Sequence, residues 1–299
     1  VAKDSEARAE AGLLHCLKTA ADESGNIFLW ESELLLMAND MLNIPVERLK
    51  SALEADILRQ VVVQEENRVY LSVNYRDEVA IACRVKTLLR TPVTFRPIFA
   101  DKAVEWAEQK MGLTLASAQW KALVLAISEK VTVITGGPGV GKTTIIRALG
   151  EIFSARKLRL FLAAPTGRAA KRMTESTGFS ATTLHRLLKF QPQTGEFFYG
   201  VNNSIPGDVF VVDECSMLDA SLARKFLEAL PDTAVLILVG DTDQLPSVGA
   251  GNVLGDLIAS GVVPYARLTT IFRQNTSGYI VRNAHRVNDG ETFELPAPG

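Results

Sequence analysis

A glycine-rich loop is the strongest chemical signal in the sequence. The stretch GGPGVGKTT follows the apolar run VTVIT and fits the pattern G-x-x-x-x-G-K-[ST]. Backbone N–H groups can wrap a phosphate where no Cβ atom intervenes, and a helix that begins at the loop adds positive potential. We expect Lys142 at the β- and γ-phosphates and the Thr143 hydroxyl on Mg²⁺. The residues expected to hold the nucleotide are Gly137, Pro138, Gly139, Val140, Gly141, Lys142, Thr143 and Thr144.

Two acidic side chains follow a second apolar run, VFVVDECSM. Asp213 and Glu214 stand directly after a stretch typical of a buried strand, and ligands of open α/β sheets bind at the C-terminal ends of strands. A phosphate site needs such an acidic element to complete the metal shell and orient water. We expect Asp213 to hold Mg²⁺ through water and Glu214 to act as the general base.

A third apolar run carries a polar end, LVGDTDQLPSVGAG. A strand there delivers Gln244 beside the same edge, near the γ-phosphate. An uncharged amide in that place can report whether the phosphate is present and so couple hydrolysis to movement.

The apolar runs also predict the elements that position these loops. From about residue 116 they alternate with helical stretches, which is typical of a parallel sheet covered on both faces and hence of an α/β fold. The expected strands are Val131–Thr135, Leu158–Ala164, Asp208–Asp213 and Thr233–Gly240.

The N-terminal part of the sequence has a different pattern. Helical spacing predicts helices near Asp4–Glu23, Glu31–Leu42 and Val46–Arg59, and VVVQEENRVYLSV then predicts a hairpin. This order is that of a small winged-helix-like α+β domain, which either reads DNA or braces a neighbour. Acids balance bases in the third helix, so we favour bracing. A helix near Asn74–Arg90 and an irregular linker, TPVTFRPIF, follow.

Composition excludes some classes of protein and leaves others open. The longest apolar stretches are far too short to span a bilayer, and we expect no export leader. Three scattered cysteines suit a reducing cytoplasm. The net charge of −2 hides a local excess of cations, which is either a polyanion-binding patch or a solvated face. This basic patch comprises Arg156, Lys157, Arg159, Arg168, Lys171, Arg172, Arg186 and Lys189, with Glu175 as its one acid.

The ordered loops resemble the motif set of superfamily 1 helicases, in particular the RecD-like branch, the exodeoxyribonuclease V alpha-subunit family. The similarity is dense from about Thr114 to His285. GGPGVGKTT resembles motif I, AAPTGRAAKRM motif Ia, VVDECSM motif II, GDTDQLPSVGAG motif III and LTTIFRQ motif IV. ATTLHRLL resembles a further RecD-type segment, and Cys215 stands where the family often has a small residue. The resemblance implies a RecA-like P-loop NTPase domain.

The resemblance also implies roles for further residues. Gln119, in LASAQWKAL, matches the family's adenine-reading glutamine, and Arg273 matches the arginine that reaches the γ-phosphate. Motif Ia lines the single-strand path in this family, where backbone phosphates are the target. The nucleic-acid candidates are therefore Thr166, Arg168, Lys171, Arg172 and, as either a contact or a packing residue, His185.

The implied activity is an ATP-dependent DNA helicase or translocase on single-stranded DNA. The family resemblance implies 5′→3′ stepping in recombination or repair, with ATP and Mg²⁺ as cofactors. Expected partners are single-stranded DNA, junctions of single and double strands, and subunits of a recombination complex, with no membrane and no nuclease activity. Two alternatives stay open: a DNA-binding P-loop switch or loader that does not travel, and a non-catalytic subunit of a recombination nuclease complex.

The expected domain organisation follows from these patterns. Nothing after Arg273 supplies motifs V and VI, so we expect an N-terminal portion lacking the second RecA-like domain, with weak nucleotide binding and little hydrolysis on its own. Between motifs Ia and II, residues 190–206 are either the hairpin that the family inserts to meet the duplex or a plain surface loop. The expected boundaries are 1–78 winged-helix-like, 79–112 helical linker, 113–275 RecA-like and 276–299 the start of the second RecA-like domain.

Overall fold

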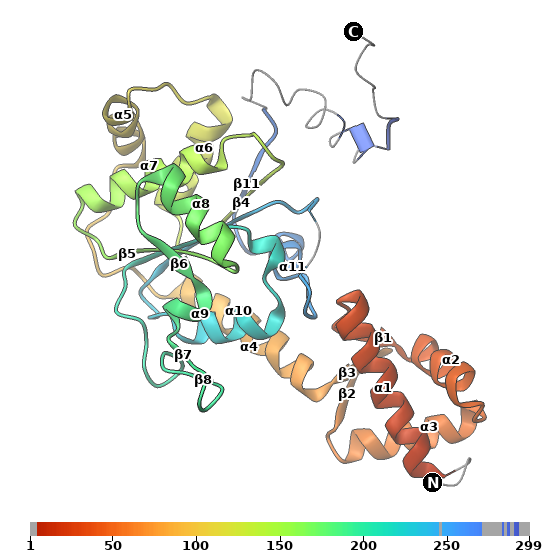
Figure 1. Cartoon of the computed structure of the whole chain (residues 1–299). Coiled ribbons are helices and arrows are strands. Elements are labelled where there is room, and N and C mark those ends of the chain that lie inside the picture. Colours follow the sequence, from red (N-terminus) through yellow and green to blue (C-terminus); the bar gives the residue numbers. More distant parts are fainter. Residues whose placement is uncertain (1–4, 245–246, 271–282, 284–285, 288–289, 293–299) are drawn as a thin grey trace. The chain divides into compact units, whose positions relative to one another are not determined.

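The chain forms two compact units (Figure 1). The computed structural model describes residues 5–244, 247–270, 283, 286–287 and 290–292. The first unit comprises Val1–Arg84, Leu218–Leu227 and Pro246–Val253. The second comprises Val85–Met217, Glu228–Leu245 and Leu254–Gly299.

Helices and a small antiparallel sheet build the N-terminal part of the first unit. Its elements are α1 (Glu6–Ser24), β1 (Phe28–Trp30), α2 (Glu31–Leu42), α3 (Val46–Leu58), β2 (Val62–Glu65) and β3 (Arg68–Leu71). The sheet has the order β1-β3-β2, with antiparallel pairs. This is the winged-helix-like order expected from the sequence, with β1 added. That strand has three residues, too few to show an alternating pattern.

Local chemistry explains where α1 begins and ends. The Ser5 hydroxyl accepts a hydrogen bond from the Arg8 N–H at 3.3 Å, and Gly25 ends the helix in the left-handed conformation. The apolar residues at helical spacing are buried in a core shared with α2, α3 and the sheet.

The second unit is an α/β layer structure around a six-stranded sheet. Its strands are β4 (Val131–Gly136), β5 (Leu160–Ala164), β6 (Ala181–Thr183), β9 (Val209–Val212), β10 (Val235–Gly240) and β11 (Tyr265–Leu268). The order is β11-β4-β10-β9-β5-β6, and all neighbouring strands pair in parallel. The expected RecA-like α/β fold with a parallel sheet is therefore confirmed. The sequence did not predict β6 and β11, the two edge strands.

Helices cover this sheet and complete its core. They include α5 (Ala100–Met111), α6 (Ser117–Ser128), α7 (Lys142–Ala155), α8 (Gly167–Thr177) and α9 (Leu184–Leu187). The preceding helix, α4 (Ser72–Arg90), belongs to the first unit as far as Arg84 and to the second unit from Val85. In the chain, α10 (Ala220–Glu228) follows β9 and α11 (Val253–Ala259) follows β10. Figure 1 shows α6, α7 and α8 together along one side of the sheet. Apolar residues of α5 to α8 form one core cluster with β4, β5, β9 and β10.

The segment between the expected motifs Ia and II contains a short hairpin. Its strands, β7 (Phe190–Gln191) and β8 (Glu196–Phe197), pair antiparallel. Among the described residues, no helix combines the length and the apolar composition that a membrane span requires.

Gly150 of α7 offers a test of the packing. Alanine in place of glycine inside a helix normally stabilises a protein by about 1 kcal/mol. Here a Cβ at Gly150 would lie 2.5 Å from Cε2 of Phe179, and such overpacking costs about 1–3 kcal/mol. We therefore expect Gly150→Ala to lower the free energy of unfolding, measured by denaturant titration.

The Phe179→Leu background provides the control for that variant. Removal of the ring leaves room for the methyl group, so Gly150→Ala should become neutral or stabilising there. Equal destabilisation in both backgrounds would contradict the packing described here.

Candidate nucleotide site

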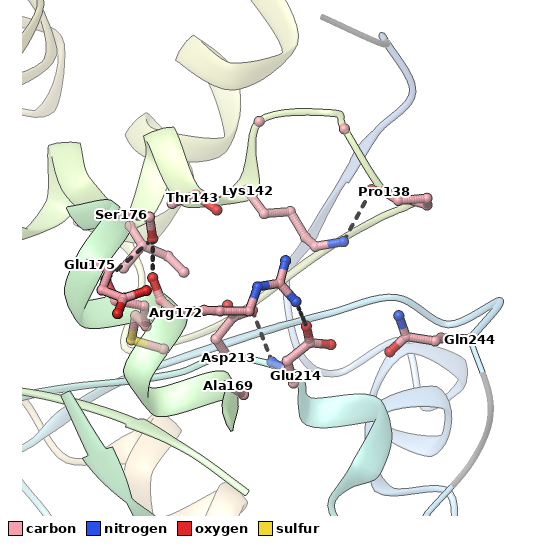
Figure 2. A pocket seen from close by; sticks show the side chains of 15 residues that line it. Pro138, Lys142, Thr143, Ala169, Arg172, Glu175, Ser176, Asp213, Glu214 and Gln244 are labelled. Carbon is pink, nitrogen blue, oxygen red and sulfur yellow. Dashed lines mark hydrogen bonds and ion pairs between the residues drawn. The ribbon is translucent and has the colours of Figure 1, made fainter. Parts of the chain in front are cut away.

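Three expected site loops leave neighbouring strands of the sheet at the same edge. β10 lies between β4 and β9, with Gly240 opposite Thr135 and Leu238 opposite Val212. Because these pairs are parallel, the loops that follow the three strands lie side by side. They open onto a cavity of about 670 Å³ (Figure 2).

The glycine-rich loop forms one wall of this cavity. Gly139 and Gly141 have φ values of 84° and 87°, a conformation that favours glycine, and α7 begins at Lys142. The Lys142 ammonium donates hydrogen bonds to the carbonyl oxygens of Gly136 and, at 3.1 Å, Gly137. The amine is therefore folded back along its own loop, and Lys142 lines the cavity.

Asp213 and Glu214 lie opposite that loop, at the end of β9. The Asp213 N–H donates to the Ala163 carbonyl at 2.9 Å, and one Asp213 carboxylate oxygen accepts the Glu214 N–H, also at 2.9 Å. Glu214 has a φ of 56°, the left-handed conformation that non-glycine residues rarely adopt. This turn sends the two carboxylates into the same cavity.

Burial raises the pKa of the Asp213 carboxyl to about 6. The negative charge of Glu214 contributes to this rise, whereas the Glu214 N–H bond and the cations of Lys142 and Arg172 act against it. The net shift means that folding places this carboxylate in surroundings that disfavour its charge.

The oxygen donors in the cavity suit Mg²⁺. Thr143 and Asp213 both line it, and a hydroxyl and a carboxylate are ligands that this cation accepts. Mg²⁺ is usually bound through one or two protein oxygens together with phosphate oxygens and water, and these two side chains fit that pattern.

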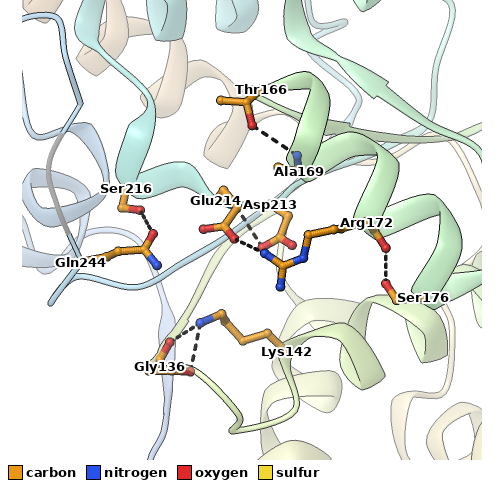
Figure 3. A network of polar contacts seen from close by, with 11 residues as sticks. Gly136, Lys142, Thr166, Ala169, Arg172, Ser176, Asp213, Glu214, Ser216 and Gln244 are labelled. Carbon is orange, nitrogen blue, oxygen red and sulfur yellow. Dashed lines mark hydrogen bonds and ion pairs between the residues drawn. The ribbon is translucent and has the colours of Figure 1, made fainter. Parts of the chain in front are cut away.

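Gln244 lines the same cavity from the loop after β10. Its side-chain carbonyl accepts a hydrogen bond from the Ser216 hydroxyl at 3.1 Å. This contact links the third loop to the turn that follows Asp213 and Glu214 (Figure 3). Ser216 is not among the site residues predicted from the sequence, although it stands in the same motif, two residues after Glu214.

The residues expected on the nucleic-acid path divide into separate groups. Arg172 of α8 lines the nucleotide cavity, and its Nη1 lies 4.0 Å from Oε1 of Glu214. Arg168 and Lys171, both exposed, are not among the lining residues. The Thr166 hydroxyl accepts the Ala169 N–H at 3.2 Å and so caps α8.

The ion pair of Arg172 with Glu214 is weak as a source of stability. The Arg172 side chain is 70% exposed and that of Glu214 is 24% exposed. Pairs this open to water contribute on the order of 1 kcal/mol or less. Helical phase does not separate Arg172 from Lys171 in the sequence, because each stands one residue from a buried residue of α8, Met173 or Ala170.

Three further candidates lie away from the cavity or outside the described residues. Gln119 is buried, and its side-chain oxygen accepts the Ala116 N–H at 3.1 Å, but it does not line the cavity. The His185 ring packs against Phe190 and Phe197 of the hairpin, at 5.9 and 5.6 Å between ring centroids. Arg273 lies outside the described residues.

Comparison with known proteins gives consistent matches. A family model described as an AAA domain matches residues 114–295, more than half of the chain. The ATP-dependent RecD2 DNA helicase of Deinococcus radiodurans is 32% identical over 97% of this chain and 41% of its own length. The RecBCD enzyme subunit RecD of Mycolicibacterium smegmatis is 39% identical over 58% of this chain and 36% of its own length.

The chain thus spans less than half the length of these relatives. Among solved structures, Pif1 helicase from Candida albicans aligns with a TM-score of 0.46 and 22% identity, over 60% of this chain and 45% of that one. That score is low, so the family assignment depends on the sequence matches.

The raised pKa of Asp213 predicts a stabilising substitution. A carboxyl whose pKa rises from its ordinary 3.8 to about 6 on folding favours the folded state below pH 4, and that contribution is lost as the pH rises through 6. Asp213→Asn removes the charge but keeps an oxygen for the Glu214 N–H. At pH 7.5 in EDTA we expect it to stabilise the chain by on the order of 2 kcal/mol, with the gain shrinking toward pH 4.

Thermal unfolding at pH 7.5 and pH 4 measures the change in stability caused by Asp213→Asn. Asp208→Asn is the control, for which we expect a change of opposite sign. The Arg159 guanidinium holds the pKa of Asp208 below its usual range, so this substitution should destabilise the chain at pH 7.5. An Asp213→Asn variant no more stable than wild type at pH 7.5 would contradict the burial described here.

Proposed function

The chain belongs to the family described as an AAA domain and to the RecD-like helicases of superfamily 1. On that premise we propose that it is the ATP-binding motor domain of a DNA helicase in recombination or repair. One observation carries the proposal. The ends of three adjacent parallel strands bring Lys142, the Asp213–Glu214 pair and Gln244 around one cavity. These are the parts that ATP hydrolysis needs: a phosphate-binding cation, a metal-binding carboxylate, a base and a group that responds to the phosphate.

Each group has a role that its position supports. On nucleotide binding, the Lys142 ammonium would leave the carbonyl oxygens of Gly136 and Gly137 for the β- and γ-phosphates. Thr143 and Asp213 would hold Mg²⁺, which supplies charge neutralisation at the phosphates when bound. Glu214 would accept the proton of the attacking water, because it lies beside the cavity with its carboxylate partly exposed.

Gln244 would transmit the state of the phosphate to the rest of the domain. Its hydrogen bond to Ser216 ties the loop after β10 to the turn that carries Glu214. A γ-phosphate that attracts the amide would therefore pull on both loops at once. Coupling of this kind converts hydrolysis into movement.

Single-stranded DNA is the proposed track. The cap at Thr166 and the exposed cations Arg168 and Lys171 belong to the segment that resembles motif Ia, and backbone phosphates are their proposed target. The 5′→3′ direction is the one that the resemblance implies. Adenine reading by Gln119 and a γ-phosphate contact by Arg273 are proposed on the same ground.

We favour a free-standing enzyme over a complex subunit because of the winged-helix-like N-terminal region. The match to the helicase named RecD2 covers 97% of this chain, whereas the matches to RecBCD RecD subunits cover 47% to 77%. The N-terminal unit is thus part of the first match. We propose that the protein acts without obligatory partners, with recombination-complex subunits as the alternative.

The test of this function is ATP hydrolysis by the full-length protein with and without single-stranded DNA. We expect strong stimulation by an oligonucleotide in wild type and a loss of at least about 100-fold in Lys142→Ala, because the main phosphate-binding cation is gone. Unchanged thermal unfolding of the variant would show that the fold is intact. Hydrolysis indifferent to DNA would indicate a switch ATPase instead, and near-normal turnover by Lys142→Ala would place the active site elsewhere.

A further inference from the structure

Arg172 differs from its basic neighbours on α8 in the direction of its side chain. On α8, Ala169, Arg172, Glu175 and Ser176 line the nucleotide cavity (Figure 2), as does the buried Met173. Lys171 does not line the cavity, and it pairs along the helix with Glu175, at 3.8 Å, with both side chains largely exposed. One face of α8 therefore belongs to the cavity although the segment as a whole resembles a DNA-contacting motif.

The guanidinium of Arg172 meets the candidate general base. Within the described residues, the cation that pairs with the Glu214 carboxylate is Arg172, with 4.0 Å between Nη1 and Oε1. The backbone on either side of Glu214 is already held, since its N–H donates to Asp213 and its carbonyl accepts the Met217 N–H at 3.1 Å. Figure 3 shows the Arg172 side chain directed toward Glu214, whereas Lys142 turns back to the glycine-rich loop.

This pair has an electrostatic consequence once a triphosphate enters the cavity. A general base must lie within hydrogen-bond reach of the attacking water, which itself lies against the terminal phosphate. Glu214 and that phosphate are both anionic, so each repels the other from the geometry that hydrolysis needs. Among the described residues that line the cavity, the cations are Lys142 and Arg172, and Lys142 has the phosphates as its target.

We infer that Arg172 is a positioning residue for ATP hydrolysis, which holds the Glu214 carboxylate beside the terminal phosphate and lies outside the DNA-contacting set of α8. This inference rests on the proposed function, because it takes Glu214 as the general base. A purely structural role does not fit a side chain that is 70% exposed in a long ion pair.

The test compares Arg172→Ala and Arg172→Lys with wild type in the full-length protein. Lys110→Ala is the matched control, since Lys110 is an exposed cation near the end of α5, away from the cavity. Four quantities are measured: kcat and KM for ATP with saturating oligothymidylate, the Kd of a fluorescent single strand at two salt concentrations, and Tm.

We expect Arg172→Ala to lower kcat about 10- to 100-fold, a part of what a general base contributes. KM for ATP should change by no more than about threefold, because the lost interaction serves the transition state. The Kd for DNA and its salt dependence should stay at wild-type values, as should Tm. Arg172→Lys should recover part of kcat, because it restores the charge without the fork, and Lys110→Ala should match wild type.

Other results overturn the inference in distinguishable ways. If Arg172→Ala kept the wild-type kcat but bound DNA more weakly and with a smaller salt dependence, Arg172 would be a phosphate contact on the DNA path. A large fall in Tm, with no recovery of kcat by lysine, would make its role structural. If the wild-type protein hydrolysed ATP at the same rate with and without DNA, only the helicase function would be refuted. If it did not hydrolyse ATP at all, both the helicase function and the positioning role of Arg172 would be refuted.

Discussion

The parallel pairing of β10 between β4 and β9 is the constraint on which the rest of the structure depends. Its register sets Gly240 beside Thr135 and Leu238 beside Val212. The three strands are buried on both faces, and alternate residues such as Val209 and Val211 belong to the core cluster with α5 to α8. A slip by one residue would exchange the side chains of the two faces. The loops after these strands are thereby held at one edge, and the cavity between them follows from the sheet.

Charge is concentrated at that edge at a cost to stability. Burial disfavours the charged form of Asp213, and Glu214 adds a second negative charge beside it. The left-handed backbone at Glu214 adds conformational strain at the same point. The buried sheet supplies the stability that makes this arrangement tolerable.

Helix α8 connects this site to the surface. Its buried residues, Ala170, Met173 and Thr177, fix its rotation against the core. That rotation directs Arg172 toward Glu214 and leaves Arg168 and Lys171 exposed. A single rigid element thus carries groups for both the nucleotide and the proposed DNA track. Motion of the nucleotide loops and grip on the strand would then be mechanically linked.

The sequence by itself determined the fold class and the chemical identity of the site. Long apolar runs that end in glycine-rich or acidic stretches specify buried parallel strands with ligand-binding ends. The bounds of the four strands predicted from the sequence agree with those of β4, β5, β9 and β10 within two residues. The glycine-rich loop specified its own conformation, because only residues without a Cβ adopt it easily. Short edge strands such as β6 and β11 carry too few residues for a pattern, and their existence depends on the neighbour with which they pair.

The tertiary structure alone decided which side chains of those motifs meet. Arg168, Lys171 and Arg172 all carry a positive charge, so their chemistry does not distinguish them. The periodicity of a helix predicts which residues share a face, but not which other element that face contacts. Packing of α8 against the core separated them, and pairing of β10 brought Gln244 to Ser216 across the two loops. Such contacts join residues far apart in the chain, so they are set by the packing of whole elements and leave no local pattern from which to predict them.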